Sequence, residues 1–347
     1  DTAEISGPGF INIRVRKEYI LRQLKTVLNQ GKDFGRTDIG RGKKVLVEFV
    51  SANPTGPLTV GHGRGAILGD IISNILEWNG YDVEREYYYN NAGLQMQRLG
   101  ESVRARYLDL LGETFEFPKE GYEGEYIINI ARKLQRRKGN SLKDLTDISP
   151  FRDIAEKNIF QEIESTLNCI GLKFDNFFNE RSLYESGAID SVLDSLRKKG
   201  LIYEKEGATW FMVSKAGRDQ DRVLIKSSGE PTYRLPDIAY HRDKFERGFH
   251  LIVDILGADH IDAYQDVLAG VEQLGYDKNK VKVIIHQFVT LMDKGEPLKM
   301  STRKAQYITL DELIKEVGPD VVRYFFIIYF LCSFDWFLCF AARYEFY

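Results

Sequence analysis

The chain has 347 residues, of which 43% are hydrophobic and 29% are charged, and its formal net charge is -3. These values are typical of a folded globular protein and exclude a long disordered chain or a fibrous repeat. The length fits about two domains, or one large α/β domain that carries an insertion.

The three cysteines, Cys169, Cys332 and Cys339, form no C-x-x-C pair. An odd number of cysteines without a pairing pattern favours a reducing compartment, so we predict a cytoplasmic protein. No His or Cys pair has the spacing of a zinc site, and we therefore expect no zinc. The chain begins with Asp1 and shows no signal-peptide pattern, which leads us to expect that upstream residues are missing.

An apolar run from Tyr324 to Ala342 is nearly long enough to cross a bilayer. Asp335 lies near its middle, where a carboxylate costs roughly 2.5 to 3.5 kcal/mol on insertion scales. We therefore predict a buried helix and no contact with a membrane. A membrane anchor remains the alternative.

The first regular elements predict a βαβ unit. Residues Lys43 to Val50 are apolar and β-branched, as in a buried parallel strand, and Tyr81 to Tyr89 form a second candidate strand. Between them, apolar rows that begin after His62 and end at Gly80 indicate a helix. Ligands of such sheets bind outside the carboxyl end of the strands.

The middle of the chain differs in character. Residues Tyr126 to Lys199 have mostly helical periodicity, interrupted at Gly171 to Phe178, and Gly200 to Val213 have the pattern of a β-hairpin. Strands and helices then alternate again, at Arg222 to Lys226, Arg234 to Gly248, Phe249 to Leu256, Ile261 to Gly275 and Val281 to Val289. The fold class predicted is α/β: a doubly wound parallel nucleotide-binding domain split by a mainly helical insertion.

Two loops are candidate phosphate sites. Gly61, His62 and Gly63 begin the first helix, where backbone N-H groups and the helix dipole favour phosphate, although a structural turn explains the glycines too. This loop has neither P-loop nor G-x-G-x-x-G spacing. Lys299 lies in a polar, basic segment before a later helix, which predicts either a loop closing over a polyphosphate or a solvated loop.

Together, these two loops carry a resemblance. "GPLTVGHGR" resembles the HIGH signature of class I aminoacyl-tRNA synthetases, and "KMSTR" resembles their KMSKS loop. The segments "VEFVSANPTGPL", "GYDVEREYYYNNAG" and "DRVLIKSSGEPTYRLPDIAYHRDKFERGF" resemble the bacterial type of arginyl-tRNA synthetase. The likeness runs from about Gly7 to Phe326, and "SGPGFINIRV" resembles the end of that family's N-terminal added domain.

The resemblance implies a Rossmann-like domain of the HIGH type in a truncated chain. The implied parts are a remnant of the N-terminal added domain with a linker at 1–40, the first half of the catalytic domain at 41–112, an insertion at 113–213, the second half with the KMSTR loop at 214–318, and the start of a C-terminal helical region at 319–347. The anticodon-binding domain is expected to be absent.

The implied function is that of an arginine-tRNA ligase. It would activate L-arginine with ATP and Mg²⁺ to arginyl-adenylate, and transfer the arginyl group to the 3′ end of tRNA-Arg. We expect a monomer. The alternatives are another HIGH-type nucleotidyltransferase that forms an acyl-adenylate, and a catalytically silent synthetase-like fragment.

The resemblance also implies residue roles. Glu48 and Asn53 would bind the α-amino end of arginine, Tyr233 and Asp237 would face its guanidinium, and His260 would line the same pocket. Positions 233 and 237 are one helical turn apart, and a carboxylate is the partner that a guanidinium prefers. ATP would contact Gly61, His62, Gly63, Lys299, Met300 and Ser301.

The implied catalytic residues are Thr59, His62 and Lys299. Thr59 stands where the family usually has a histidine, and threonine can donate one hydrogen bond but cannot be cationic. Thr302 replaces the second lysine of KMSKS. After Phe326 the family pattern ends.

Overall fold

The apolar run before Phe49 forms the central strand of a parallel sheet. The computed structural model describes residues 2–287, 291–293, 296–297, 307–331 and 345–346. In these residues a five-stranded sheet has the order β10 (Val281–His286), β9 (Leu251–Gly257), β3 (Lys44–Glu48), β4 (Asp82–Tyr89) and β5 (Asn176–Asn179). All four pairings are parallel, so the predicted doubly wound sheet is confirmed.

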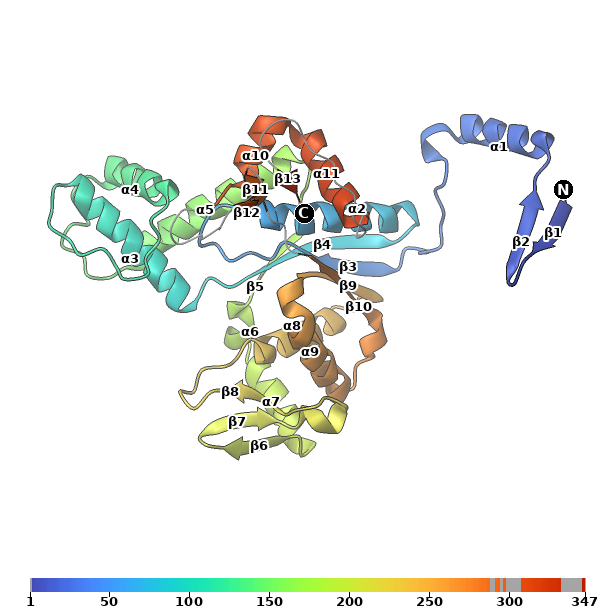
Figure 1. Ribbon diagram of the computed structural model, residues 1–347. Coiled ribbons are helices and arrows are strands. Elements are labelled where there is room, and N and C mark those ends of the chain that lie inside the picture. Colours follow the sequence, from blue (N-terminus) through green and yellow to red (C-terminus); the bar gives the residue numbers. More distant parts are fainter. Residues whose placement is uncertain (1, 288–290, 294–295, 298–306, 332–344, 347) are drawn as a thin grey trace.

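Alternate side chains of β3 face two different helical layers. Val45 and Val47 belong to the core on the side of helix α2, whereas Leu46 packs with Phe249 on the other side. The first layer contains α2 (Val60–Trp78), α10 (Leu310–Val317) and α11 (Pro319–Leu331), and the second contains α8 (Arg234–Glu246) and α9 (Ile261–Leu274), as Figure 1 shows. Glu48, two positions after Leu46, therefore lies on the α8 side.

The connections from β3 and β9 diverge, which creates a switch point between these two strands. After β3 the chain passes through α2 to β4, which lies on the far side of β3 from β9. After β9 it passes through α9 to β10, which lies on the far side of β9 from β3. A Cβ atom on Gly69 of α2 would clash with the ring of Phe49, so this glycine lets α2 pack directly on the sheet. The crevice at the carboxyl ends of β3 and β9 is the expected ligand position.

The middle of the chain is helical but also contributes to the sheet. Helices α3 (Gly93–Leu110), α4 (Glu125–Lys138) and α5 (Ser149–Cys169) lie beside the sheet, and α6 (Arg181–Glu185) and α7 (Ala188–Lys198) follow β5 (Figure 1). The interruption predicted at 171–178 contains most of β5, which pairs with β4, so the segment 113–213 is not entirely an insertion. Phe177 holds this strand by packing 5.3 Å from the buried ring of Tyr87.

The hairpin predicted at 200–213 is confirmed. Strands β6 (Ile202–Lys205) and β7 (Ala208–Phe211) are joined by Glu206 and Gly207, whose φ values are 54° and 73°. The prediction that Arg222 to Lys226 continues the large sheet is wrong. Strand β8 (Arg222–Ile225) pairs antiparallel with β7 instead, and the short segment 212–221 between these two strands is enough for an antiparallel pairing.

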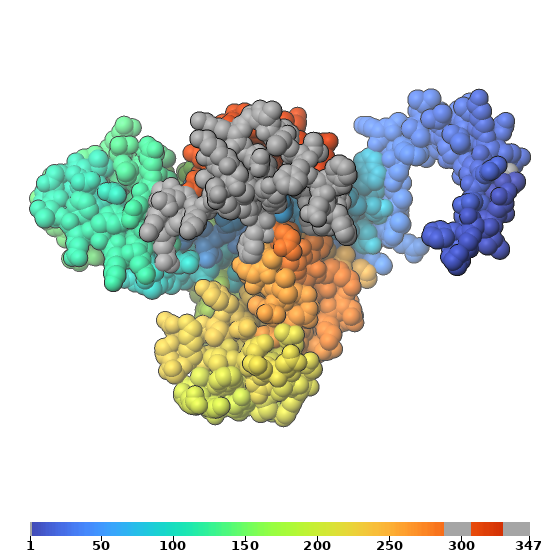
Figure 2. All heavy atoms as spheres, viewed as in Figure 1, coloured from blue at the N-terminus to red at the C-terminus, as the bar shows by residue number. Residues whose placement is uncertain are grey.

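The N-terminal residues form an arm that stands apart from the body (Figure 2). It consists of β1 (Thr2–Ser6), β2 (Phe10–Arg14) and α1 (Lys17–Gln30), and Ile5 is 88% exposed. Three further short strands form a separate sheet: β11 (Leu291–Asp293), β12 (Glu296–Pro297) and β13 (Glu345–Phe346). No helix of the described residues is long and apolar enough to cross a membrane. Of the apolar run at 324–342, residues after 331 lie outside the described part.

Candidate active site

The chain makes a strained turn as it leaves β3. Val50 and Ser51 have φ values of 68° and 46°, a left-handed conformation that is unusual for a β-branched residue. The turn brings Ser51 Oγ back to donate a hydrogen bond to Glu48 Oε1 at 2.9 Å. Ser51 Oγ also accepts a hydrogen bond from the backbone N-H of Tyr88 at 3.2 Å. The exit of β3 is thus fastened to β4.

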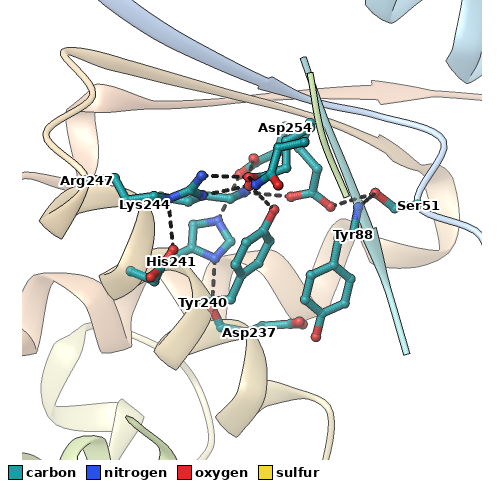
Figure 3. Close-up of polar contacts among 12 residues, drawn as sticks. Ser51, Tyr88, Asp237, Tyr240, His241, Lys244, Arg247 and Asp254 are labelled. Carbon is teal, nitrogen blue, oxygen red and sulfur yellow. Dashed lines mark hydrogen bonds and ion pairs between the residues drawn. The ribbon is translucent and has the colours of Figure 1, made fainter. Parts of the chain in front are cut away.

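Glu48 forms a buried ion pair with Lys244 of α8. Lys244 Nζ lies 2.6 Å from Glu48 Oε2 and 2.7 Å from Asp254 Oδ1, and the lysine is 0% exposed (Figure 3). Burial lowers the pKa of Lys244, but the carboxylates of Asp254 and Glu48 outweigh this and raise the pKa above its ordinary value. Both oxygens of Glu48 therefore have partners within the protein, although each can accept a second hydrogen bond.

His241 extends this network along α8. Its Nε2 lies 2.8 Å from Asp254 Oδ2 and its Nδ1 lies 2.8 Å from the backbone oxygen of Asp237. Both partners are oxygen atoms that can accept a hydrogen bond, and the two contacts hold the ring between α8 and β9. Burial raises the pKa of Asp254, and the charges of Lys244 and His241 more than reverse that shift and hold it below its ordinary value.

Asp237 has a carboxylate without a protein partner. In the residues that the structure describes, no hydrogen bond or ion pair reaches this half-buried side chain, which lies at the edge of the network on the side of Tyr88 (Figure 3). Burial is the largest cause that raises its pKa to about 7, and the negative charges of Glu48 and Glu180 add to it. His241 and Lys244 act in the opposite direction. This carboxylate is poised to accept a cation.

Glu180 completes the acidic group and is not among the residues predicted from the sequence. Its carboxylate accepts hydrogen bonds from Tyr88 Oη at 2.6 Å and from Asn90 Nδ2 at 2.8 Å. The rings of Tyr88 and Tyr240 lie 4.5 Å apart beside it. Glu180 directly follows β5, so the available signal was its place at the carboxyl end of a strand that had been taken for an interruption.

A polar stripe on α8 was also available in the sequence. Asp237, Tyr240, His241 and Lys244 have the spacing i, i+3, i+4 and i+7, which places them on one face of a helix. Only Asp237, its first member, is among the residues predicted from the sequence. In a helix that packs on a buried sheet, such a stripe predicts a buried polar network.

At the start of α2, His62 is fixed by Thr59. The backbone N-H of Thr59 donates to His62 Nδ1 at 3.0 Å, and Thr59 Oγ1 lies 3.1 Å from the same nitrogen. Burial lowers the pKa of His62 to about 4, with a smaller contribution from His286. At neutral pH the ring is therefore neutral, and because Nδ1 accepts, its proton is on Nε2.

The two glycines beside His62 have different surroundings. A Cβ atom on Gly63 would lie 2.8 Å from Leu310 Cδ1 and 3.0 Å from Phe326 Cε2, so Gly63 lets α10 and α11 pack on α2. A Cβ atom on Gly61 would meet only Thr59 Oγ1, at 3.5 Å. Gly61 has the open backbone that a ligand could approach, and packing accounts for Gly63.

The remaining sequence-predicted residues lie near the same edge or outside the described part. Asn53 is exposed, and its side-chain oxygen accepts from the backbone N-H of Asn90 at 3.0 Å. Tyr233 precedes α8 and is 80% exposed, one turn before Asp237. His260 follows β9 and is exposed. The last three predicted residues, Lys299, Met300 and Ser301, lie outside the described residues.

Comparison with known proteins gives a family match over most of the chain. Residues 23–320 match the family described as tRNA synthetases class I (R), catalytic domain. The chain is 59% identical over 325 residues to the arginine–tRNA ligase of Desulfotalea psychrophila, covering 94% of this chain and 59% of that protein. It is 52% identical over 342 residues to the arginine–tRNA ligase of Salinibacter ruber, covering 94% and 61%.

A solved structure is similar over most of the fold. A Campylobacter jejuni protein assigned as an arginyl-tRNA synthetase superposes with a TM-score of 0.81 at 35% identity, covering 90% of this chain and 69% of that one. The chain spans about three fifths of the length of the two curated relatives. The family model matches most of the chain, and these relatives agree with it, so the chain belongs to the family described as tRNA synthetases class I (R), catalytic domain.

Proposed function

We propose that this chain is the catalytic part of an arginine–tRNA ligase. It activates L-arginine with ATP to arginyl-adenylate and transfers the arginyl group to the 3′ end of tRNA-Arg. The relatives named above support this proposal. The observation that carries it is the carboxylate of Asp237, which lacks a protein partner in the described residues and lies beside Glu180 at the carboxyl edge of the sheet.

A guanidinium is the cation that this site suits. Its planar fork of N-H donors pairs with carboxylates through directed hydrogen bonds and stacks on aromatic rings. Asp237 and Glu180 provide two carboxylates, and the half-buried ring of Tyr88, backed by the buried ring of Tyr240, lies next to them. Tyr233, exposed at the start of α8, would cover the guanidinium from the solvent side.

The α-amino end of the substrate would lie toward β3. We propose that Glu48 and Asn53 accept hydrogen bonds from the ammonium with the lone pairs that their protein partners leave, and that His260 lines the pocket. This arrangement leaves the substrate carboxylate free to face the nucleotide, as the reaction requires.

ATP would bind at the N-terminus of α2. His62 donates from Nε2, the open backbone of Gly61 approaches the phosphates, and Thr59 contributes its hydroxyl. Lys299, Met300 and Ser301 are assigned to the nucleotide by family resemblance, and Mg²⁺ would arrive with the phosphates of its substrate.

The chemistry is two successive transfers without a covalent enzyme intermediate. A carboxylate oxygen of arginine attacks the α-phosphorus of ATP, the bond to the β-phosphate oxygen breaks, and pyrophosphate leaves. A terminal ribose hydroxyl of tRNA then attacks the arginyl carbonyl carbon, and AMP leaves. The protein accelerates both steps by positioning the reactants and stabilising charge.

The domain arrangement is part of the same proposal. Residues 41–112 and 214–318 are the two halves of the catalytic domain, with β5 added from the intervening 113–213 and β8 assigned to the small sheet. Residues 1–40 belong to the N-terminal added domain and its linker, and 319–347 begin a C-terminal helical region. We place the protein in the cytoplasm as a monomer.

Arginine-dependent exchange of pyrophosphate into ATP tests this function. The proposal predicts exchange that requires L-arginine when tRNA-Arg is present. Exchange that is driven by another acid without tRNA would instead indicate that the chain is a different nucleotidyltransferase. The third outcome is no exchange from either wild type or a Thr59→His variant, each within the full-length protein. It would indicate that the chain is a catalytically silent relative of the synthetases.

A further inference from the structure

We infer that Lys244 is a positioning residue of the arginine site, acting through Glu48. This inference rests on the proposed function. Lys244 touches no substrate in this assignment. Its ammonium orients Glu48 and balances the buried charges, so that the uncompensated negative charge of the site is concentrated at Asp237 and Glu180.

The geometry holds the ammonium from three elements. Lys244 belongs to α8, Glu48 ends β3, and Asp254 lies in β9, with contacts of 2.6 Å and 2.7 Å to the two carboxylates. The ring of Tyr240 covers the remaining side, with its centroid 4.2 Å from Nζ. A fully buried lysine with this set of partners has a fixed position, and it fixes the carboxylate of Glu48 in turn.

The surrounding charges are distributed unevenly. Lys244 and the ring of His241 contact Asp254, and Lys244 also contacts Glu48. In the described residues no cation contacts the carboxylate of Asp237 or that of Glu180. The donors to Glu180 include Tyr88 and Asn90, which are neutral. The buried ammonium of Lys244 thus balances the carboxylates of β3 and β9, whereas the two carboxylates that would face the guanidinium receive no such contact.

Another buried carboxylate nearby, that of Glu86, has its own cation and makes no direct contact with Lys244. Arg247 donates to Glu86 with two nitrogens, at 2.6 Å and 2.7 Å, and Tyr240 also donates to that carboxylate. The pairing leaves Lys244 available to Glu48 and Asp254. Loss of the lysine would leave two buried carboxylates close together without their shared cation, and Glu48 would lose its orientation.

A double-mutant cycle on L-arginine binding tests this role. Lys244→Met, Glu48→Gln and the double variant are titrated with L-arginine by calorimetry, and the fold of each is checked by thermal unfolding. Lys244→Met should weaken arginine binding roughly tenfold or more, and the double variant should bind no more weakly than Glu48→Gln alone, since the two residues act as one unit. ATP affinity should be unchanged throughout.

The matched control is Arg242→Met. Arg242 is a cation of the same helix that pairs with Glu246 and Ser191 away from the site, so its loss should leave arginine affinity unchanged. A folded Lys244→Met variant with wild-type arginine affinity would overturn the inference, as would full additivity with Glu48→Gln. If Lys244→Met does not fold, the double variant, which lacks both charges, is compared with Glu48→Gln, and a further loss of affinity contradicts the inference. Failure of the wild type to bind arginine would reject the proposed function itself.

Discussion

The ammonium of Lys244 lies 2.6 Å from the carboxylate of Glu48, although the two residues are 196 positions apart in the chain. The contact joins β3, the central strand of the sheet, to α8, the helix that precedes β9. Its formation requires both halves to be folded. The arginine site proposed here is therefore a product of the assembled sheet.

Replacement of Asp237 by Ala should abolish detectable arginine binding and leave ATP binding nearly unchanged. The reason is that the guanidinium would lose its charged partner, a change that typically weakens binding by roughly 30-fold or more. Titration calorimetry with each ligand measures both effects. The exposed Asp194→Asn, on α7, provides a control for the loss of a carboxylate, and equal arginine affinity in Asp237→Ala and wild type would reject the assignment.

Arginine affinity should rise with pH up to neutrality. The pKa of Asp237 in the ligand-free protein is about 7, above its ordinary value of 3.8, so below pH 7 the group must release a proton before it pairs with a guanidinium. The affinity should therefore fall about tenfold for each pH unit below 7 and level off above it. Calorimetry between about pH 5.5 and 8, in buffers of different ionisation enthalpy, measures the affinity and the proton released.

The same pKa predicts the sign of a stability effect. Because the folded protein holds this proton more tightly than the unfolded chain, the free energy of unfolding without ligand should fall as pH rises between the two pKa values, and then remain level. Asp237→Asn removes the ionisation, so the variant should lose less stability than wild type across this window. Parallel curves for the two proteins would contradict the raised pKa.

Alanine at Gly61 and at Gly63 should have opposite consequences. At Gly63 the new methyl group would press on Leu310 and Phe326, and overpacking of this kind costs about 1 to 3 kcal/mol of unfolding free energy. At Gly61 there is space, so stability should hold or rise slightly while ATP binding weakens. Urea denaturation and ATP titration separate the two. Unchanged ATP affinity in a stable Gly61→Ala would remove Gly61 from the nucleotide site.

The hydroxyl of Thr59 should matter for adenylate formation more than for folding. The backbone N-H of residue 59 holds His62 in any case, so Thr59→Val should change the unfolding free energy by no more than about 1 kcal/mol. Loss of a donor to the reacting phosphate should slow arginine-dependent exchange by about a hundredfold, whereas Thr59→Ser should retain most of the rate. Equal exchange rates for the Val and Ser variants would show that the hydroxyl has no part in the reaction.

Much of the sheet could be predicted from sequence because β3, β9 and β10 are mostly apolar and rich in β-branched residues. That signal predicts the strands at 43–50, 249–256 and 281–289, whereas the more polar β4 is indicated by its place after the helix that follows β3. Strand β5 was missed because it has only four residues between two helical stretches, and its aromatic side chains are stabilised by tertiary packing on Tyr87. Strand β8 was placed in the wrong sheet because β-propensity does not specify a partner.

The candidate site divides in a similar way. Asp237 and His62 were named from motif and helix position, and both lie at the carboxyl edge of the sheet. The partners of Glu48 were not predicted, because Lys244 and Ser51 reach it through tertiary contact and a left-handed turn at two residues that are not glycine. The polar stripe on α8 marks Lys244 as part of a buried network, but a sequence does not say which distant residue the ammonium contacts.

The most direct test of the guanidinium site compares L-arginine with L-citrulline, which has nearly the same shape but no positive charge on its side chain. Each is titrated into the wild-type chain under the same conditions, with Asp237→Asn as the variant that removes the charge from the protein instead. The charge pairing at Asp237 predicts that wild type binds arginine at least about 30-fold more tightly than citrulline, and that Asp237→Asn loses most of this preference. Equal binding of the two ligands to wild type would contradict the account.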